Sequence, residues 1–277
     1  MTPRTLVTRT LASGATIEIS TVAERPEFAH PNHDTGWWPA FMRHNHVADA
    51  YYWRAGEDFR HTCVVATEGR RAVAYGVAVP LVLGGNGRET LPDGGWEKAL
   101  VWAFHDAADT DAAPDSACAL DISVARTLRG QGVSRLMLQA LRTAVRDAGL
   151  AQLVAPVRPT WKDREPRTPM RAYAARLRPD GLPYDPWLRT HVRAGGEIVG
   201  VAPASWVVHG SLRQWREWTG LPFDRTGDVD VPGALAPVHC DLDGGHAVYV
   251  EPNVWVRHVV RPMAGGLREA QGRIEST

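Results

Sequence analysis

Short segments of the chain alternate apolar and polar positions or run through β-branched apolar residues, and both patterns are typical of strands. Residues 16–22 alternate with a period of two. Residues 61–67 and 71–83 are apolar runs separated by the turn Glu68-Gly69-Arg70, which predicts a strand hairpin whose second strand ends near Pro80. Further strands are predicted at residues 118–124, 150–157, 197–201 and 246–260.

Other segments repeat apolar residues every three or four positions, and this spacing predicts amphipathic helices. The strongest pattern starts near Val133 and stops at Gly149, and a capping-box pattern at Ser211 predicts a helix at residues 212–219. Further helices are predicted at residues 96–108, with Trp96, Leu100, Val101, Phe104 and Ala108 on one face, at 169–177 and 186–194, and within 34–59, where Asp34 is a candidate cap. No repeat or linker divides the pattern, which predicts one α+β domain with insertions.

Composition narrows the class of protein. The chain has 277 residues, of which 44% are hydrophobic and 22% charged, so it can bury the core of a folded domain. Basic and acidic residues number 31 each, which leaves no bulk field to attract nucleic acid or an anionic membrane. The longest apolar stretch, around residues 72–83, is too short to span a bilayer, and no signal-length apolar run follows the N-terminus.

The cysteines indicate a compartment. Cys63, Cys118 and Cys240 are odd in number, far apart and without a CxxC pair, which argues against a disulfide framework and a cysteine-rich zinc site. A reducing cytoplasm fits this usage best, so we expect a soluble, cytoplasmic protein.

The segment from the strand at residues 118–124 to the helix at Val133 carries the clearest chemical signal. Gly130 and Gly132 lie where the strand becomes a helix, so backbone N–H groups and the positive end of the helix dipole meet in one turn. This context predicts an anion site for a diphosphate, although glycines in an ordinary tight turn are the alternative. No lysine follows the glycines as in a Walker loop, and no GxGxxG occurs, so another nucleotide-phosphate site ranks last.

The residues Arg129-x-x-Gly132-x-Ser134 resemble motif A of the GNAT superfamily of acyl-CoA N-acyltransferases, which reads Arg or Gln, two residues, Gly, one residue, then Gly or Ala. Ser134 departs from the pattern by its larger side chain. The resemblance implies acetyl-CoA or another acyl-CoA as co-substrate. It implies that backbone amides of Arg129, Gly130, Gln131, Gly132, Val133 and Ser134 hold the pyrophosphate, and that Ser123 and Val124 pair with the pantetheine arm.

The same resemblance implies a fold. The order of predicted elements is similar to the GNAT order over residues 14–260, within a single domain that spans residues 1–277. It implies an α+β fold in α/β/α layers, with a central, mixed, mostly antiparallel twisted sheet flanked by helices. Residues 84–115, 158–185 and 204–240 would be large insertions, and a homodimer is a habit of the family.

Acyl transfer to an amine needs a neutral amine, a polarised carbonyl and a proton for the leaving thiolate. Asp121 lies where family members often carry an acidic residue facing the acceptor, so it is the candidate base, or else a structural strand-end carboxylate. The family tyrosine that precedes a glycine by four residues is replaced by His191, ahead of Gly195. His191 is therefore the candidate acid or a core histidine, and Tyr173 and Tyr184 are rival donors.

Two clusters of side chains leave alternatives open. The aromatic residues flank the acceptor cleft in the family or fill a core; they are Trp37, Trp38, Phe41, Tyr51, Tyr52 and Trp53. The histidines His30, His33, His44 and His46 have no acidic or cysteine partner at a convincing spacing, so no metal site is expected. Glu251 and Asn253 share one face of the last predicted strand, where they line the cleft or only a sheet edge.

Together these features predict a cytoplasmic acyltransferase that moves an acetyl or short acyl group from acyl-CoA to an amine of a small molecule. Direct transfer is expected, because no cysteine or serine is placed for a covalent relay. The alternative is a non-catalytic acyl-CoA-binding sensor or accessory protein of the same fold, suggested by the absent tyrosine and the large inserts.

Overall fold

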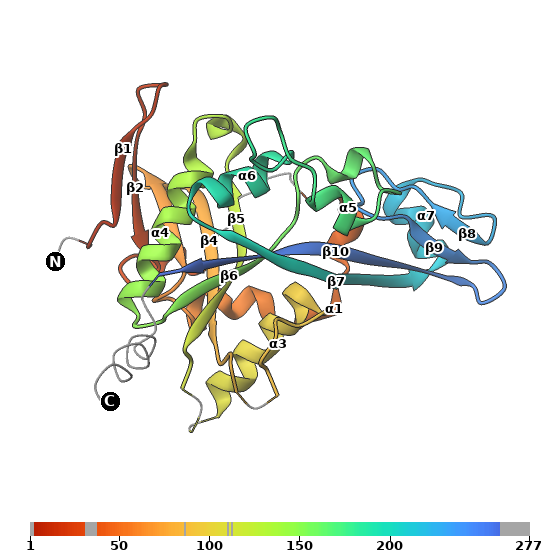
Figure 1. Ribbon diagram of the computed structural model, residues 1–277, viewed down its shortest axis with the longest axis horizontal. Coiled ribbons are helices and arrows are strands. Elements are labelled where there is room, and N and C mark those ends of the chain that lie inside the picture. The colour runs from red at the N-terminus through yellow and green to blue at the C-terminus, as the bar shows by residue number, and fades with distance from the viewer. Residues whose placement is uncertain (1–2, 31–37, 86, 110, 112, 261–277) are drawn as a thin grey trace, which may run out of the picture.

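A twisted ten-stranded sheet organises the computed structural model, which describes residues 3–30, 38–85, 87–109, 111 and 113–260 (Figure 1). The strand order is β1-β2-β3-β4-β5-β6-β10-β9-β8, and β7 pairs with the other edge of β10. The strands are β1 (Val7–Thr10), β2 (Thr16–Thr21), β3 (Val64–Glu68), β4 (Arg71–Leu81), β5 (Ser116–Val124), β6 (Gln152–Val157), β7 (Glu197–Ser211), β8 (Gly227–Val229), β9 (Val238–Asp241) and β10 (His246–Val259). Only β5 and β6 pair in parallel among the described strands, so the sheet is mixed and mostly antiparallel.

Helices cover both faces of the sheet. They are α1 (His46–Tyr51), α2 (Ala55–Asp58), α3 (Gly95–Ala108), α4 (Val133–Asp147), α5 (Met170–Ala174), α6 (Pro186–Arg193) and α7 (Leu212–Thr219). The apolar stripe of α4 packs with Ile17, Val64 and Ala74 in one core, whereas α3 packs with Val65, Val77 and Val79 in a second core on the opposite face. The predicted α+β fold, with its layers of helix, sheet and helix, is confirmed.

The described strands and helices agree with most of the predicted ones, and two differences matter. The strand predicted at residues 197–201 continues to Ser211, because β7 pairs along most of β10. The buried face of α3 runs through Ala99, Ala103 and Asp106, not through Val101, Phe104 and Ala108, since this helix packs between β7 and β4 and Arg88 pairs with Asp106. Asp34, His33 and Trp37 lie outside the described residues.

A bulge in β5 decides which side chains face α3. Val77 of β4 pairs with Asp121, but Ala78 pairs with Ala119, so Leu120 is an extra residue in the strand. Leu120 contributes its side chain to the core beneath α3, and Asp121 turns to the same face, where it contacts Tyr52. The bulge thus places a carboxylate on the face of the sheet opposite α4.

Strands β5 and β6 pair over only part of their length. Residues 116–118 pair with residues 152–154, and no described pairing joins the strands beyond Cys118. On its other side β5 pairs with β4, and the Ala125 N–H donates to Val73 O. In an antiparallel pair, alternate residues direct their backbone groups to the partner strand. Ser123 therefore directs its backbone groups to β4, and Val124 directs its own away from β4. The backbone groups of Val124 therefore point to the edge of β5 that no longer pairs with β6.

The outer edge of β7 is closed by side chains from two helices. Glu97 of α3 accepts from Val207 N–H at 2.6 Å and from the Asn45 amide, which also donates to Val207 O at 2.9 Å. Burial raises the pKa of Glu97, while the Val207 N–H lowers it. These bonds hold α1 and α3 against β7 and protect an edge that would otherwise carry unpaired backbone groups. No helix in the described part of the chain has the length and apolarity to cross a bilayer.

Replacing Glu97 tests this edge. Glu97→Leu leaves the Val207 N–H and the Asn45 amide without their acceptor, and we expect the free energy of unfolding to fall by about 2 kcal/mol in urea denaturation. Glu97→Gln keeps one carbonyl oxygen as acceptor and should lose less than about 1 kcal/mol. Equal losses in the two variants would show that the hydrogen bonds do not carry the stabilisation.

Candidate functional site

The turn between β5 and α4 has the backbone that only glycine adopts easily. Gly130 and Gly132 have φ values of 74° and 78°, and Gly132 directly precedes α4. A Cβ atom built on either glycine meets nothing within 4 Å, so the turn is open above both residues. The two glycines are therefore required by backbone conformation and not by close packing against a neighbour.

The turn exposes a row of backbone donors. In the described part of the chain, the N–H groups from Gly130 to Ser134 donate to no backbone or side-chain acceptor, and α4 extends for fifteen residues behind them. Unpaired donors at the positive end of a helix dipole favour a negatively charged ligand with several acceptor oxygens. The diphosphate of coenzyme A fits this donor set, and the open space above Gly130 and Gly132 allows its approach.

Asp121 lies on the strand that leads into this turn. Its Oδ2 atom accepts from the Tyr52 hydroxyl at 3.2 Å and from the Ser123 hydroxyl. Burial raises the pKa of Asp121 to about 6, although both hydrogen bonds lower it. Burial and the neighbouring carboxylate raise the pKa of Tyr52, so this phenol keeps its proton and donates it in the hydrogen bond. At neutral pH Asp121 is thus an ionised, partly desolvated carboxylate.

His191 belongs to a different cluster. Its side chain is 2% exposed, and its Nδ1 atom lies 3.0 Å from Nε2 of His258 on β10. Burial and His258 lower the pKa of His191 to about 3, and burial and Arg142 lower the pKa of His258 to about 4. Both rings are therefore neutral at pH 7, and no described contact joins His191 to Asp121. The structure thus argues for a core histidine at this position.

The rival proton donors are also placed. The Tyr173 hydroxyl is buried and donates to Asp185 at 2.9 Å, and burial raises the pKa of this phenol. Tyr184 is 38% exposed and packs edge-on against Tyr173, at 6.2 Å between ring centroids. No described contact links either tyrosine to Asp121.

Aromatic rings extend from Asp121 across the face of the sheet. Tyr52 lies 5.4 Å from Trp96 between ring centroids, Trp96 lies 4.6 Å from Trp206, and Trp206 stacks on Trp38 at 5.5 Å. We call Tyr52, Trp96, Trp206 and Trp38 the aromatic row. Of the other predicted aromatic residues in the described part of the chain, Phe41 is buried against Trp215 and Tyr249, Tyr51 packs on Phe104, and Trp53 is 61% exposed.

The sequence does not predict several of these neighbours of Asp121. Tyr52 was assigned only to an aromatic cluster, because its contact with Asp121 joins residues 69 positions apart. The sequence around Trp96 predicts only a helix position, and Trp206 falls within the predicted insertion at residues 204–240, so neither is indicated as a neighbour of Asp121. The aromatic richness of the chain was the one available signal, and it does not distinguish a ring beside a carboxylate from a ring in a core.

The cysteines and histidines suggest no other chemistry. All three cysteines are free and buried; burial raises the pKa of Cys63 to about 12 and also raises the pKa values of Cys118 and Cys240. None is therefore a ready thiolate nucleophile at neutral pH. Within the described residues, no three His, Cys, Asp or Glu side chains are placed to hold a metal ion.

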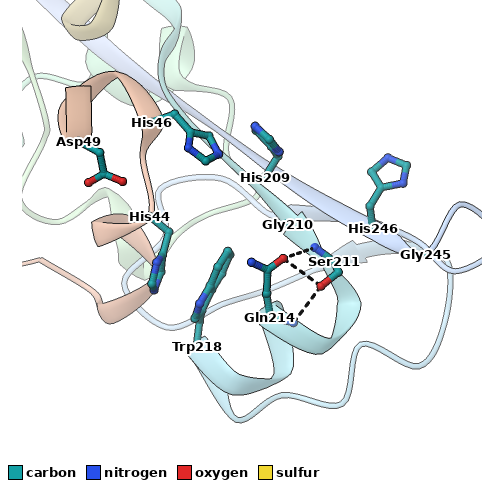
Figure 2. A pocket seen from close by; sticks show the side chains of 10 residues that line it. All are labelled: His44, His46, Asp49, His209, Gly210, Ser211, Gln214, Trp218, Gly245 and His246. Carbon is teal, nitrogen blue, oxygen red and sulfur yellow. Dashed lines mark hydrogen bonds between the residues drawn. The ribbon is translucent and has the colours of Figure 1, made fainter. Parts of the chain in front are cut away.

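A separate pocket of about 490 Å³ lies at the far end of β7 (Figure 2). His44 stacks on Trp218 at 4.1 Å and His46 lies 4.8 Å from His209, as measured between ring centroids. The lining comes from α1, β7, α7 and neighbouring turns; it consists of His44, His46, Asp49, His209, Gly210, Ser211, Gln214, Trp218, Gly245 and His246. This pocket contains none of the residues predicted for acyl transfer.

The sheet, the glycine turn ahead of α4 and the carboxylate on β5 have the features of an acyl-CoA-dependent N-acyltransferase. No model of a known protein family matches the chain. Arginine N-acetyltransferase avaD from Aspergillus versicolor is 31% identical in an alignment that covers 87% of this chain and 93% of that protein. The chain therefore belongs to the GNAT superfamily and is a GNAT-type N-acetyltransferase.

A solved structure agrees with the fold. The loading GNATL domain of CurA from Lyngbya majuscula matches with a TM-score of 0.56 at 13% identity, over 88% of this chain and 98% of that domain. At this identity the likeness shows the fold alone. The family resemblance predicted from Arg129, Gly132 and Ser134 is thus confirmed, and the sensor alternative gives way to an enzyme.

A substitution in the glycine turn tests the anion site. Gly132→Ala forces an L side chain into left-handed backbone, at a cost of about 1–2 kcal/mol, and should disturb the row of N–H donors. We expect CoA to raise the thermal midpoint less in this variant than in the parent. Gly149→Ala is the matched control, since Gly149 has φ 89° at the other end of the same helix and nothing within 4 Å of a built Cβ. An equal response to CoA in both variants would contradict the assignment.

The buried histidine pair predicts acid sensitivity. His191 and His258 stay neutral in the fold, whereas the unfolded chain protonates them near pH 6.5, so the unfolded state binds more protons below that pH. The free energy of unfolding should therefore fall as pH drops from 6.5 toward 4, by about 1.4 kcal/mol per pH unit for each histidine. Urea titrations of the parent and of His191→Gln measure the slope, and an unchanged slope in the variant would refute this origin.

Proposed function

We propose that this N-acetyltransferase transfers an acetyl group from acetyl-CoA directly to an amine of a small molecule. The observation that carries the proposal is the position of Asp121. This partly desolvated carboxylate, with its pKa raised to about 6, lies on the strand that ends in the glycine turn. Base and anion site are thereby fixed to one another by a few residues of rigid backbone.

The co-substrate would be held by backbone more than by side chains. Residues Gly130 through Ser134 would bind the diphosphate with the N-terminal amides of α4, whereas the Arg129 N–H, also predicted for this role, donates to Arg126 O at 3.4 Å. Val124 would pair with the pantetheine arm, because its backbone turns away from β4. Ser123, also predicted for this pairing, turns its backbone to β4 and instead donates its hydroxyl to Asp121. Bound there, acetyl-CoA supplies the activated acyl group as a thioester.

Asp121 would accept the proton that the acceptor ammonium must lose before attack. The free amine then forms a bond to the acyl carbon, the carbon–sulfur bond breaks, and the sulfur leaves as a thiolate. The attacking nitrogen releases its remaining extra proton to solvent as the amide forms. The same carboxyl, now protonated and with a pKa near 6, is acidic enough to return its proton to a thiolate whose ordinary pKa is about 8.5. The predicted role of His191 as the acid is not needed in this scheme, and the neutrality of its ring argues against that role.

Direct transfer is supported by the state of the nucleophiles. The three cysteines are buried with raised pKa values, so none is a ready thiolate. A covalent relay through cysteine would require an activated thiolate next to a base. The described site offers a carboxylate that can deprotonate an incoming amine.

The acceptor is proposed from the relative. The protein that is 31% identical is named as an arginine N-acetyltransferase, which supports an amino acid or a related amine as acceptor. The equal numbers of acidic and basic residues support a small acceptor and not a nucleic acid or an anionic membrane.

Three free, buried cysteines support a reducing, cytoplasmic compartment. A single transferase domain is supported by one sheet that runs from β1 to β8, and a homodimer stays an expectation.

Replacing the base gives the first test of mechanism. Asp121→Asn keeps the shape but cannot accept the amine proton, so we expect kcat to fall about 100- to 10,000-fold. The CoA-induced rise in thermal midpoint should persist, because the diphosphate is held elsewhere. Thiol release from acetyl-CoA in the presence of L-arginine and other amines measures the rate. An unchanged rate would remove Asp121 from the mechanism.

The hydrogen bond from Tyr52 gives a test in pH. This bond lowers the pKa of Asp121, so Tyr52→Phe should raise that pKa and move the acidic limb of the kcat/KM profile from about 6 to higher pH. Tyr51→Phe is the matched control, since Tyr51 packs on Phe104 and has no described contact with Asp121. A profile that moves equally in both variants would contradict the role of the bond.

A further inference from the structure

Trp206 carries a buried hydrogen-bond donor without a partner. Its side chain is 8% exposed, and its Nε1 atom has no acceptor among the residues that the structure describes. Other buried indoles do find acceptors: Trp96 donates to Leu120 O, Trp215 to Ala247 O and Trp255 to Pro92 O. A buried donor left unpaired costs about 1–3 kcal/mol, so this position calls for an explanation.

A second donor lies next to it. Trp206 on β7 pairs directly with Glu251 on β10, and Glu251 holds the guanidinium of Arg158 at 3.0 Å. Arg158 follows the end of β6, where β6 no longer pairs with β5, and 24% of its side chain is exposed. Its Nε atom bonds Glu251 and its Nη2 atom bonds Gly233 O, while Nη1 makes no hydrogen bond in the described part of the chain.

The carboxylate of Glu251 is fully engaged and fixes this arrangement. It is 1% exposed, and besides Arg158 it accepts from the Tyr249 hydroxyl at 2.7 Å and from the Asn253 amide at 3.1 Å. Burial alone lowers the pKa of Arg158, but the charge of Glu251 raises it, so the guanidinium stays charged. Glu251 thus holds Arg158 in one orientation with one end of its planar group free.

The two donors share a sheet face with the base. Trp38 stacks on Trp206, and the guanidinium carbon of Arg158 lies 5.9 Å from the Trp38 ring. On its other side Trp206 contacts Trp96, whose N–H bonds the carbonyl of Leu120, the residue before Asp121. Two rings of the aromatic row, Trp96 and Tyr52, therefore lie between Trp206 and Asp121.

We propose that Trp206 Nε1 and Arg158 Nη1 form a carboxylate-binding subsite for the acceptor, so that this enzyme selects amino acids over the corresponding simple amines. This inference rests on the proposed function. Both groups can only donate, so the ligand must present acceptors, and a carboxylate is the acceptor-only group that an amino acid carries. An acceptor held there by its carboxylate directs its amine along the aromatic row toward Asp121. Glu251 and Asn253 then position Arg158 and do not touch the substrate.

The test compares two acceptors that differ only in the carboxylate, L-arginine and its decarboxylated form, agmatine. Trp206→Phe removes the N–H and keeps most of the ring surface. We expect kcat/KM for L-arginine to fall about 10- to 100-fold, the effect of losing a hydrogen bond to a charged group, while kcat/KM for agmatine changes by less than about 3-fold. Trp218→Phe, the same substitution in α7 at the separate pocket, should change neither value.

A binding measurement separates this inference from the proposed reaction. Calorimetric titration of L-arginine and agmatine into the CoA-bound enzyme should show tighter binding of L-arginine, and Trp206→Phe should reduce the difference in affinity. That result supports the subsite even if no thiol is released from acetyl-CoA, an outcome that would contradict the proposed transfer reaction and not the subsite. Equal binding of both ligands by the parent, or an equal loss for both in the variant, overturns the subsite.

Arg158→Lys provides a second variant that keeps the charge beside buried Glu251 and thus avoids leaving that carboxylate unpaired. The lysine ammonium lacks the planar set of guanidinium donors. The ratio of kcat/KM for L-arginine to kcat/KM for agmatine should therefore fall, as in Trp206→Phe. Retention of the CoA-induced rise in thermal midpoint shows that either variant is folded. A preference that survives in both variants is evidence against the subsite.

Discussion

The early end of pairing between β5 and β6 is the constraint on which the site depends. The two parallel strands share hydrogen bonds only over residues 116–118 and 152–154. Beyond that point Val124 directs its backbone groups away from β4, and Arg158 directly follows the last residue of β6. A sheet paired along its full length would use the backbone groups of Val124 internally, so the separation leaves them available, as the proposed thioester site requires.

Burial of polar groups distinguishes the working side chains from the structural ones. Asp121 is partly desolvated but has two hydroxyl donors, so its pKa stays near 6 and its carboxylate is ionised at neutral pH. His191 and His258 are desolvated with little compensation and remain neutral. The two hydroxyl donors thus offset part of the pKa rise that burial causes at Asp121, whereas nothing comparable offsets the fall in pKa at the two histidines.

In the proposed site, the acceptor side is built by segments that differ most from a minimal GNAT order. Residues 158–185 and the long strand β7 supply Arg158 and Trp206, and α3 supplies Trp96, which joins them to β5. The edge of β7 is in turn closed by Glu97 from α3. The co-substrate side consists mainly of backbone, which a family shares, whereas the acceptor side consists of side chains that each chain can choose.

The sequence by itself predicted most of the elements and the glycine turn ahead of α4, because period-two and helical patterns and the motif from Arg129 to Ser134 are local. It also proposed Asp121, by its position three residues before Val124. Only the tertiary structure decided that a bulge at Leu120 turns Asp121 toward Tyr52, and that His191 faces a second histidine. These outcomes depend on register and on contacts between distant segments, and local pattern carries no information about either.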